Sequence, residues 1–131
     1  SIVKNENDLY NEFKRLIENE QIYLYKYNDP WELCGLINFS DCILTSKLHV
    51  GIVALRLGKS VISIPIHPQK TQRLYNQINE GERCLALDNA TSIEIGKLLH
   101  KYHNKSISLS DEVIKASMKN WEYLDSFLNK L

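Results

Sequence analysis

The sequence predicts an α/β fold with a doubly wound parallel sheet of the Rossmann-like type. Short apolar segments typical of buried strands alternate with segments whose apolar residues recur at helical spacing. The intervals between the apolar segments are long enough for crossover helices, which are right-handed and produce a parallel sheet covered on both faces. We therefore expect a single Rossmann-like domain over residues 1–131.

The first third of the chain is expected to hold two helices and a strand. The apolar residues of segment 9–17 have helical spacing, and QIYLYKY, residues 21–27, is rich in β-forming residues. Asp29 followed by Pro30 is a helix-start signal, because aspartate caps the helix and proline suits its first position. This signal predicts a short helix over residues 30–38.

Two pairs of a strand and a helix follow. CILT, residues 42–45, predicts a short strand, and Ser46 can cap a helix that ends at Gly58. VISIPI, residues 61–66, predicts a buried strand, and the helix after it is expected over residues 71–78.

The last third is expected to contain a strand and two helices. CLAL, residues 84–87, predicts the strand, and residues 88–91 offer caps for a helix over residues 92–103. A last helix is expected to begin at Asp111. Its apolar stripe consists of Ile114, Met118, Trp121, Leu124, Leu128 and Leu131.

The charge balance argues against a nucleic-acid-binding protein. Sixteen basic residues balance sixteen acidic residues, so the chain has no global field that would attract polyanions. No apolar stretch reaches the length of about 20 residues that a transmembrane helix needs. We expect a cytoplasmic protein, with a peripheral association with the inner face of the membrane as a further option. Ser1 in place of an initiator methionine favours a part of a longer protein.

The cysteines and two of the histidines are interpreted as structural or solvated residues. Cys34, Cys42 and Cys84 are scattered and form no CxxC pair, which favours free buried thiols. His100 and His103 have the spacing of two metal ligands on one helix face, but no third ligand is evident. We predict no metal site and no cofactor.

Several aromatic and basic residues have a structural interpretation. Trp31 and Trp121 have aliphatic partners at helical spacing and are interpreted as core or interface residues. Arg56 and Arg73 are interpreted as surface charges. The alternating tyrosines of the predicted first strand need no ligand to explain them; they are Tyr23, Tyr25 and Tyr27.

The segment that follows the strand over 42–45 is a candidate anion site. Ligands of open parallel sheets bind beyond the carboxyl ends of the strands, where helix N-termini present unpaired N–H groups. Ser46, Lys47 and His49 come directly after one predicted strand, and His67 and Lys70 follow the next one. The lysines suit a phosphate or carboxylate, and His49 suits a general acid. The pattern alone also fits a His49 that packs or caps beside solvated lysines.

A longer pattern around these residues resembles a known enzyme family. Asp41 opens the strand, Lys47, Leu48 and His49 follow it, and a Pro-x-Lys sequence ends at Lys70. This resembles the C-terminal half of the polysaccharide pyruvyltransferases, enzymes with a GT-B-like pair of Rossmann-type domains. The arginine that the family places before Leu-His is lysine here, which keeps the charge and loses the bidentate fork.

The resemblance implies transfer of the enolpyruvyl group of phosphoenolpyruvate to sugar hydroxyls, which gives a pyruvate ketal in a cell-surface polysaccharide. It implies His49 as the general acid, and Lys47, Lys70, Ser46 and His67 as donor-binding residues. Its implied partners are phosphoenolpyruvate, a glycan or lipid-linked sugar acceptor, and an N-terminal domain of the same protein.

Two other interpretations stay open. A nucleotide-sugar glycosyltransferase half has the same architecture, but segment 41–70 lacks the Gly-rich turn and the acidic residue that such domains show. A non-catalytic domain of the same fold is favoured by Lys47 and by the short chain. A preceding domain of similar size in the full open reading frame would favour the enzyme.

Overall fold

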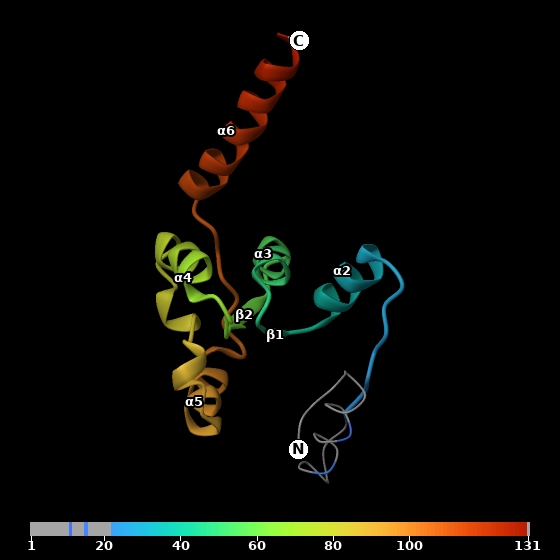
Figure 1. Cartoon of the computed structure of the whole chain (residues 1–131), viewed down its shortest axis with the longest axis vertical. Helices are drawn as coiled ribbons and strands as arrows, with labels where there is room; N and C mark the ends of the chain where they lie inside the picture. Colours follow the sequence, from blue (N-terminus) through green and yellow to red (C-terminus); the bar gives the residue numbers. More distant parts are fainter. Residues whose placement is uncertain (1–10, 12–14, 16–21, 131) are drawn as a thin grey trace. The chain divides into compact units, whose positions relative to one another are not determined.

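The computed structural model describes residues 11, 15 and 22–130 of the chain, without the side chains of residues 120 and 121 (Figure 1). The chain contains two compact units, Ser1–Leu33 and Cys34–Leu131. The predicted helix over 9–17 lies outside the described residues, except that Asn11 and Arg15 are helical. Trp121, as a side chain, and Leu131 lie outside them too.

Residues 22–27 form no strand, so the strand predicted over 21–27 is wrong for its described part. Tyr23, Tyr25 and Tyr27 are 80%, 54% and 52% exposed. A high content of β-forming residues produces a strand only when a second strand supplies the hydrogen-bond ladder and a surface to pack on. No strand pairs with this segment in the described part of the chain.

Helix α2 covers Pro30–Phe39 and confirms the predicted first cap. The Glu32 N–H donates a hydrogen bond to Asp29 Oδ1 at 2.9 Å, so the aspartate satisfies one of the unpaired donors at the helix start. The Glu32 carboxylate accepts a hydrogen bond from the Asn28 N–H at 2.8 Å. The two side chains therefore fix where this helix begins.

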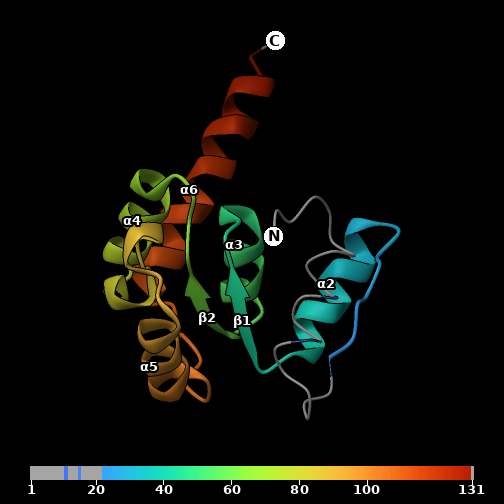
Figure 2. The same ribbon diagram turned by 60° about the horizontal axis from the view of Figure 1, so that its bottom comes forward.

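The second unit is built on two parallel strands, β1 (Cys42–Thr45) and β2 (Ser60–Ser63). They run side by side in the same direction, with Thr45 opposite Ser63 at their carboxyl ends (Figure 2). All four residues of β2 are buried. The fold is therefore a mixed α/β structure with a small parallel sheet.

The sheet is smaller than the sequence predicts. The strand expected over 61–66 ends at Ser63, and the strand expected over 84–87 is reduced to one bridge between Ser63 and Cys84. Two short 3-10 helices, η1 (Gly81–Arg83) and η2 (Leu87–Asn89), turn the chain away from the ladder on either side of that bridge. The described residues therefore do not confirm a doubly wound sheet.

Helix α3 (Leu48–Arg56) connects the two strands and ends as predicted. Gly58 adopts a left-handed conformation with φ of 69°, which other residues adopt at a cost. The Lys59 N–H donates to Ala54 O at 2.9 Å and the Gly58 N–H donates to Leu55 O at 3.1 Å. These two bonds form a Schellman motif that satisfies the last carbonyl groups of the helix.

Helix α4 covers Pro68–Gln77 and begins one turn before the predicted start at Thr71. Proline suits the first turn of a helix because it lacks an N–H that would stay unpaired there. The helix packs near η1 and ends at Ile78 with Asn79 in a left-handed conformation, φ 58°.

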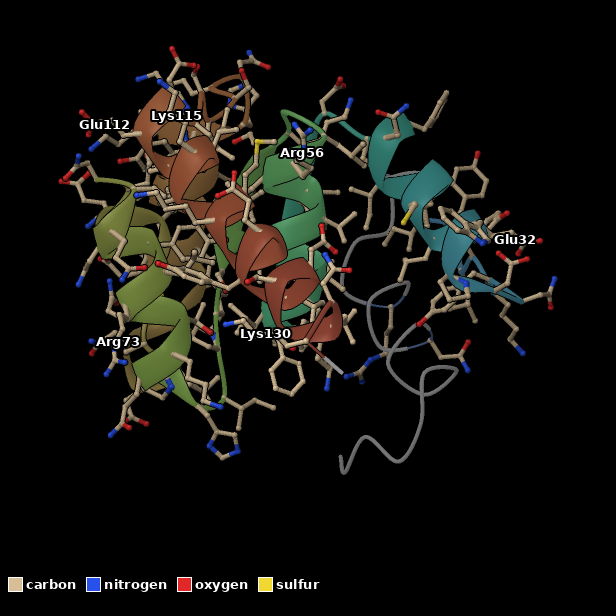
Figure 3. All side chains as sticks on the ribbon, turned by 90° about the horizontal axis from the view of Figure 1, so that it is seen from above. Glu32, Arg56, Arg73, Glu112, Lys115 and Lys130 are labelled. Atoms are coloured by element: carbon tan, nitrogen blue, oxygen red, sulfur yellow. The ribbon has the colours of Figure 1, made fainter. Side chains whose placement is uncertain are left out.

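The last two helices, α5 (Ser92–Tyr102) and α6 (Asp111–Leu128), begin where the sequence predicts, and the predicted capping segment of α5 supplies its cap. The Thr91 hydroxyl accepts a hydrogen bond from the Glu94 N–H at 3.2 Å, and the Ser110 hydroxyl accepts one from the Val113 N–H at 3.3 Å. Glu112 and Lys115 on α6 extend outward in Figure 3.

The described part of the α6 stripe is largely exposed. Met118, Leu124 and Leu128 are 59%, 45% and 53% exposed. A groove of about 480 Å³ lies between α3, α4 and the first half of α6. The groove is lined by Ile52, Leu55, Arg56, Leu74, Ile78, Leu109, Val113, Ile114, Ser117 and Met118.

The core of the second unit centres on β2 and the faces of α3 and α4 that turn toward it. Ala54, Val61 and Ile62 are fully buried, and Tyr75 is 1% exposed. The three cysteines are free, but only Cys84 is buried. None of the helices in the described residues is long and apolar enough to cross a membrane.

Candidate functional site

Two loops leave the sheet at the same edge, because β1 and β2 are parallel and in register. The Ile64 N–H donates to Thr45 O at 2.8 Å and ties the ends of the two strands together. One loop leads into α3, whose start carries Lys47 and His49, and the other leads into α4, whose first turn carries Lys70. The predicted residues therefore lie at the starts of two helices that follow this edge.

Lys47, and not Ser46, is the N-cap residue of α3. Lys47 has extended backbone angles of φ −99° and ψ 122°, and its carbonyl accepts the first helical hydrogen bond from the Gly51 N–H at 3.1 Å. The capping role predicted for Ser46 is wrong because Thr45 competes with it. The Thr45 hydroxyl accepts the Lys47 N–H at 3.0 Å in a local turn, which delays the helix.

The start of α3 presents unpaired donors and positive charge. Among the described residues, the N–H groups of Leu48, His49 and Val50 have no hydrogen-bond partner. The first turn contains no acidic residue that could compensate the positive end of the helix dipole. Lys47 is exposed at the same place. This arrangement can bind a small anion through backbone N–H groups and one full charge.

The start of α4 repeats part of this arrangement. His67 is its N-cap residue, with φ −115° and ψ 94°, and its side chain makes no capping hydrogen bond. Lys70 lies in the first turn, which again contains no acidic residue. His67 and Lys70 are both exposed, as are Ser46 and His49. Two uncompensated helix starts with lysines give this edge a local positive potential in a chain without net charge.

Two hydroxyl groups at this end of β2 were not found by sequence reasoning. Ser63 Oγ and Tyr75 OH are buried and have no hydrogen-bond partner among the described residues. Burial raises the pKa of Tyr75 to about 12, and Cys84 acts in the same direction. The nearby Ser63 hydroxyl lowers the pKa of Tyr75 against these two effects. The two hydroxyl groups are close neighbours, but their geometry is not that of a hydrogen bond.

A different polar cluster lies at the other end of β2, where Arg83 is only 2% exposed. Its Nε donates to Glu80 at 2.7 Å, its Nη1 to Ser60 Oγ at 3.0 Å, and its Nη2 to Lys105 O at 2.7 Å. The guanidinium also stacks on the Tyr102 ring, 4.3 Å from the ring centre. Arg83 therefore joins β2, η1 and the segment after α5.

The one sequence signal for both clusters is the strand SVIS. It carries Ser60 and Ser63 at its two ends, and a polar side chain in a buried strand requires a partner. The partners come from distant parts of the chain, so the sequence does not reveal them.

The remaining histidines and Trp31 do not form part of this site. Within the described ranges, no group of three possible metal ligands occurs. His103, the C-cap residue of α5, has its Nδ1 atom 2.9 Å from Leu99 O in the last turn of that helix. Trp31 is 82% exposed, which excludes the core interpretation and leaves that of an interface residue. Arg56 and Arg73 are exposed and extend outward in Figure 3, as expected for surface charges.

Comparison with protein families assigns the chain. The family model named polysaccharide pyruvyl transferase matches residues 1–68, which is more than half of the 131 residues. The chain belongs to the polysaccharide pyruvyl transferase family. The match covers Asp41, Lys47, His49 and His67 and ends two residues before Lys70. No curated protein and no solved structure gives a match.

This is a family of transferases, and its name indicates polysaccharides as the acceptors. The matched residues include β1 and the start of α3, where the unpaired N–H groups and Lys47 lie.

Proposed function

We propose that the chain supplies the donor-binding half of a pyruvyltransferase that transfers the enolpyruvyl group of phosphoenolpyruvate to a sugar. Phosphoenolpyruvate carries a phosphate and a carboxylate, two anionic groups that suit the two helix starts with their lysines. The observation that carries the proposal is the start of α3. There, three N–H groups without partners among the described residues and Lys47 meet with no acidic residue in the first turn.

The two anionic groups of the donor have separate binding groups in this proposal. The N–H groups at the start of α3 and the Lys47 ammonium bind the phosphate, and Lys70 at the start of α4 binds the carboxylate. Ser46 and His67 line the same edge as additional donors. Lys47 binds as a point charge, so the backbone N–H groups supply the directional hydrogen bonds that arginine supplies elsewhere in the family.

His49 acts as the general acid. It protonates the methylene carbon of phosphoenolpyruvate, which leaves positive charge on the adjacent carbon. A sugar hydroxyl attacks that carbon, the bond from carbon to the phosphate oxygen breaks, and inorganic phosphate leaves. A second hydroxyl of the sugar then closes the ketal. Of the two hydroxyl protons, one replaces the proton that His49 gave and one leaves with the phosphate, so the histidine is regenerated.

The acceptor site and the rest of the sheet belong to a longer protein in this proposal. A GT-B arrangement places the acceptor between two Rossmann-like domains, and the described chain supplies one wall of such a cleft. The strands that a doubly wound sheet requires beyond β1 and β2 would come from the remainder of that protein. The reaction then takes place in the cytoplasm on a glycan or lipid-linked sugar precursor.

The proposal is tested by product formation in the complete protein. Incubation with phosphoenolpyruvate and glycan acceptors is expected to release phosphate only when acceptor is present, and the acceptor is expected to gain the mass of a pyruvyl ketal. Lys70→Ala should weaken donor binding about tenfold, because it removes one charge-assisted hydrogen bond. Lys97→Ala is the matched control, since Lys97 is an exposed lysine that pairs with Glu94 on α5.

Equal donor affinities in the Lys70 and Lys97 variants would remove Lys70 from the site. Phosphate release that does not depend on any acceptor would contradict a transferase.

A further inference from the structure

Two buried hydroxyl groups lack partners at the end of β2 that faces the proposed donor site. Ser63 and Tyr75 are each 1% exposed, and neither Ser63 Oγ nor Tyr75 OH makes a hydrogen bond within the described part of the chain. A buried hydroxyl without a partner destabilises a fold, so each one in a native protein calls for an explanation.

The Tyr75 hydroxyl lies against the first turn of α3. A Cβ atom added to Gly51 would come within 3.1 Å of Tyr75 OH and within 3.9 Å of the Thr45 methyl group. Gly51 is the residue whose N–H closes the first turn by donating to Lys47 O at 3.1 Å. Because Gly51 has no side chain, the Tyr75 hydroxyl can approach the first turn of α3 closely. The N–H groups of Leu48, His49 and Val50 in this turn have no partner among the described residues.

Two similar buried side chains near the opposite end of β2 do have partners. Ser60, at the opposite end of the same strand, donates to Tyr102 O and accepts from Arg83. The Tyr102 hydroxyl donates to Glu82 at 2.6 Å. Among the described residues, the buried hydroxyls without a partner therefore lie at the carboxyl end of β2 and not at its amino end.

We propose that the hydroxyl pair, Ser63 Oγ and Tyr75 OH, forms the inner polar wall of the anion site and positions the bound phosphate through an ordered water beneath the first turn of α3. A bridging water can satisfy both hydroxyls and still donate to an anion oxygen, at little cost in affinity compared with a direct contact. The inference rests on the proposed function, because it takes the start of α3 as the donor site.

The protonation state of Tyr75 supports this role. Burial raises its pKa to about 12, so the phenol keeps its proton at neutral pH and can donate a hydrogen bond. Ser63 and Tyr75 are positioning residues here, since neither touches the reacting atoms.

The test compares two tyrosine variants with opposite expectations. Tyr75→Phe should weaken inorganic phosphate binding about three- to tenfold, while the melting temperature of the phosphate-free chain stays unchanged or rises because no hydrogen bond within the described part of the chain is lost. Tyr102→Phe is the matched control. It should lower the melting temperature, because the bond to Glu82 is lost, and leave phosphate affinity unchanged. Ser63→Ala and Ser60→Ala form a second pair with the same expectations.

Gly51→Ala probes the same contact from the other side. The added methyl group would displace the Tyr75 hydroxyl, so this variant should lose a similar factor in phosphate affinity. In the Tyr75→Phe background the same substitution should cost less, because the hydroxyl is already absent; a double-mutant cycle measures that coupling.

The outcomes separate this inference from the proposed function. If the unmodified chain binds phosphate with amide shifts at Ser46–Val50 and Tyr75→Phe binds equally well, the hydroxyl pair has no such role and the proposed function stands. A parallel loss of stability and affinity in Tyr75→Phe would overturn the inference in favour of a packing role. If the unmodified chain binds neither phosphate nor phosphoenolpyruvate, the donor site itself is wrong.

Discussion

Strand β2 carries a serine at each end, and the two serines lie in opposite environments. Ser60, at the amino end, belongs to a cluster in which the buried Arg83 finds Glu80, Ser60 and Lys105 as hydrogen-bond partners. Ser63, at the carboxyl end, lies beside Tyr75, and neither hydroxyl has a partner among the described residues. Both ends are buried, so exposure does not explain the difference.

Polar side chains at the amino end of β2 hold the fold together, whereas the hydroxyls at its carboxyl end have no partner among the described residues. A satisfied polar cluster stabilises one arrangement of the elements around it, whereas unpaired donors in a folded chain represent binding capacity that is not yet used. In parallel sheets the carboxyl ends of the strands face the ligand. Strand β2 agrees with that rule, because the hydroxyl of Ser60 at its amino end has hydrogen-bond partners and the hydroxyl of Ser63 at its carboxyl end has none among the described residues.

The largest effect is expected at the carboxyl end. In the complete enzyme, His49→Gln should lower turnover about 10²- to 10⁴-fold, which is the usual contribution of a general acid, and weaken donor binding much less. Glutamine keeps a hydrogen-bond donor, so the fold should survive. Steady-state kinetics and direct donor titration measure the two quantities, with His103→Gln on α5 as the control. Equal losses in turnover and donor binding would make His49 a binding residue.

The amino end of β2 should respond through stability. Arg83→Ala should lower the free energy of unfolding by about 3–5 kcal/mol, because it leaves Glu80 and Ser60 without their partner in a buried cluster. Urea unfolding followed by circular dichroism measures this loss. Arg73→Gln, at an exposed position on α4, should change stability by less than about 0.5 kcal/mol. If the two variants lose similar stability, the cluster does not organise the fold.

Replacing each of two glycines by alanine should change the stability of the chain in opposite directions. Gly58→Ala should destabilise the chain by about 1–2 kcal/mol, because the φ of 69° at the end of α3 disfavours a Cβ atom. Gly96→Ala, inside α5 with open space around its Cα, should stabilise the chain by about 0.5–1 kcal/mol. Thermal unfolding of both variants checks the opposite signs; a loss in both would contradict the assigned conformations.

The smallest effect is a pH dependence near the amino-end cluster. Hydrogen bonds from Lys101 and Tyr102 lower the pKa of the exposed Glu82 carboxyl. The stability that this carboxylate contributes is therefore present above the pKa of an unfolded glutamate and is lost as pH falls through its lowered folded pKa. Glu82→Gln should remove this small contribution at neutral pH and flatten the stability curve in the acidic range, so the two chains become equally stable at low pH. An unchanged curve would show that the contact is too weakly populated to matter.

Local signals made part of this fold predictable from the sequence. Asp29 before Pro30 marks the start of α2, and Gly58 marks the end of α3, because caps depend on residues a few positions apart. The strand expected over 21–27 is absent from its described part because a strand needs a pairing partner that local sequence does not specify. At Ser46 two local signals competed, and the Thr45 hydroxyl prevailed.

Some residues around the candidate site could be suggested from the local sequence, and others could not. Lys47, His49 and Lys70 could be named from the sequence, since residues that follow parallel strands gather at one edge. Arg83 and Tyr75 could not, because their environment depends on distant contacts; Arg83 bonds Ser60 across 23 positions. Long polar side chains are usually exposed, so residue type alone does not mark Arg83 as buried.

We propose that an anion binds at the carboxyl edge of β1 and β2, whereas the amino end of β2 holds the fold together. Titration of the isotope-labelled chain with phosphoenolpyruvate, followed by amide NMR signals, tests it most directly. The signals of Ser46–Val50 and of Gln69 and Lys70 should shift first and saturate together, while those around Ser60 and Arg83 stay in place. Shifts confined to scattered surface lysines, or centred on Arg83, would contradict it.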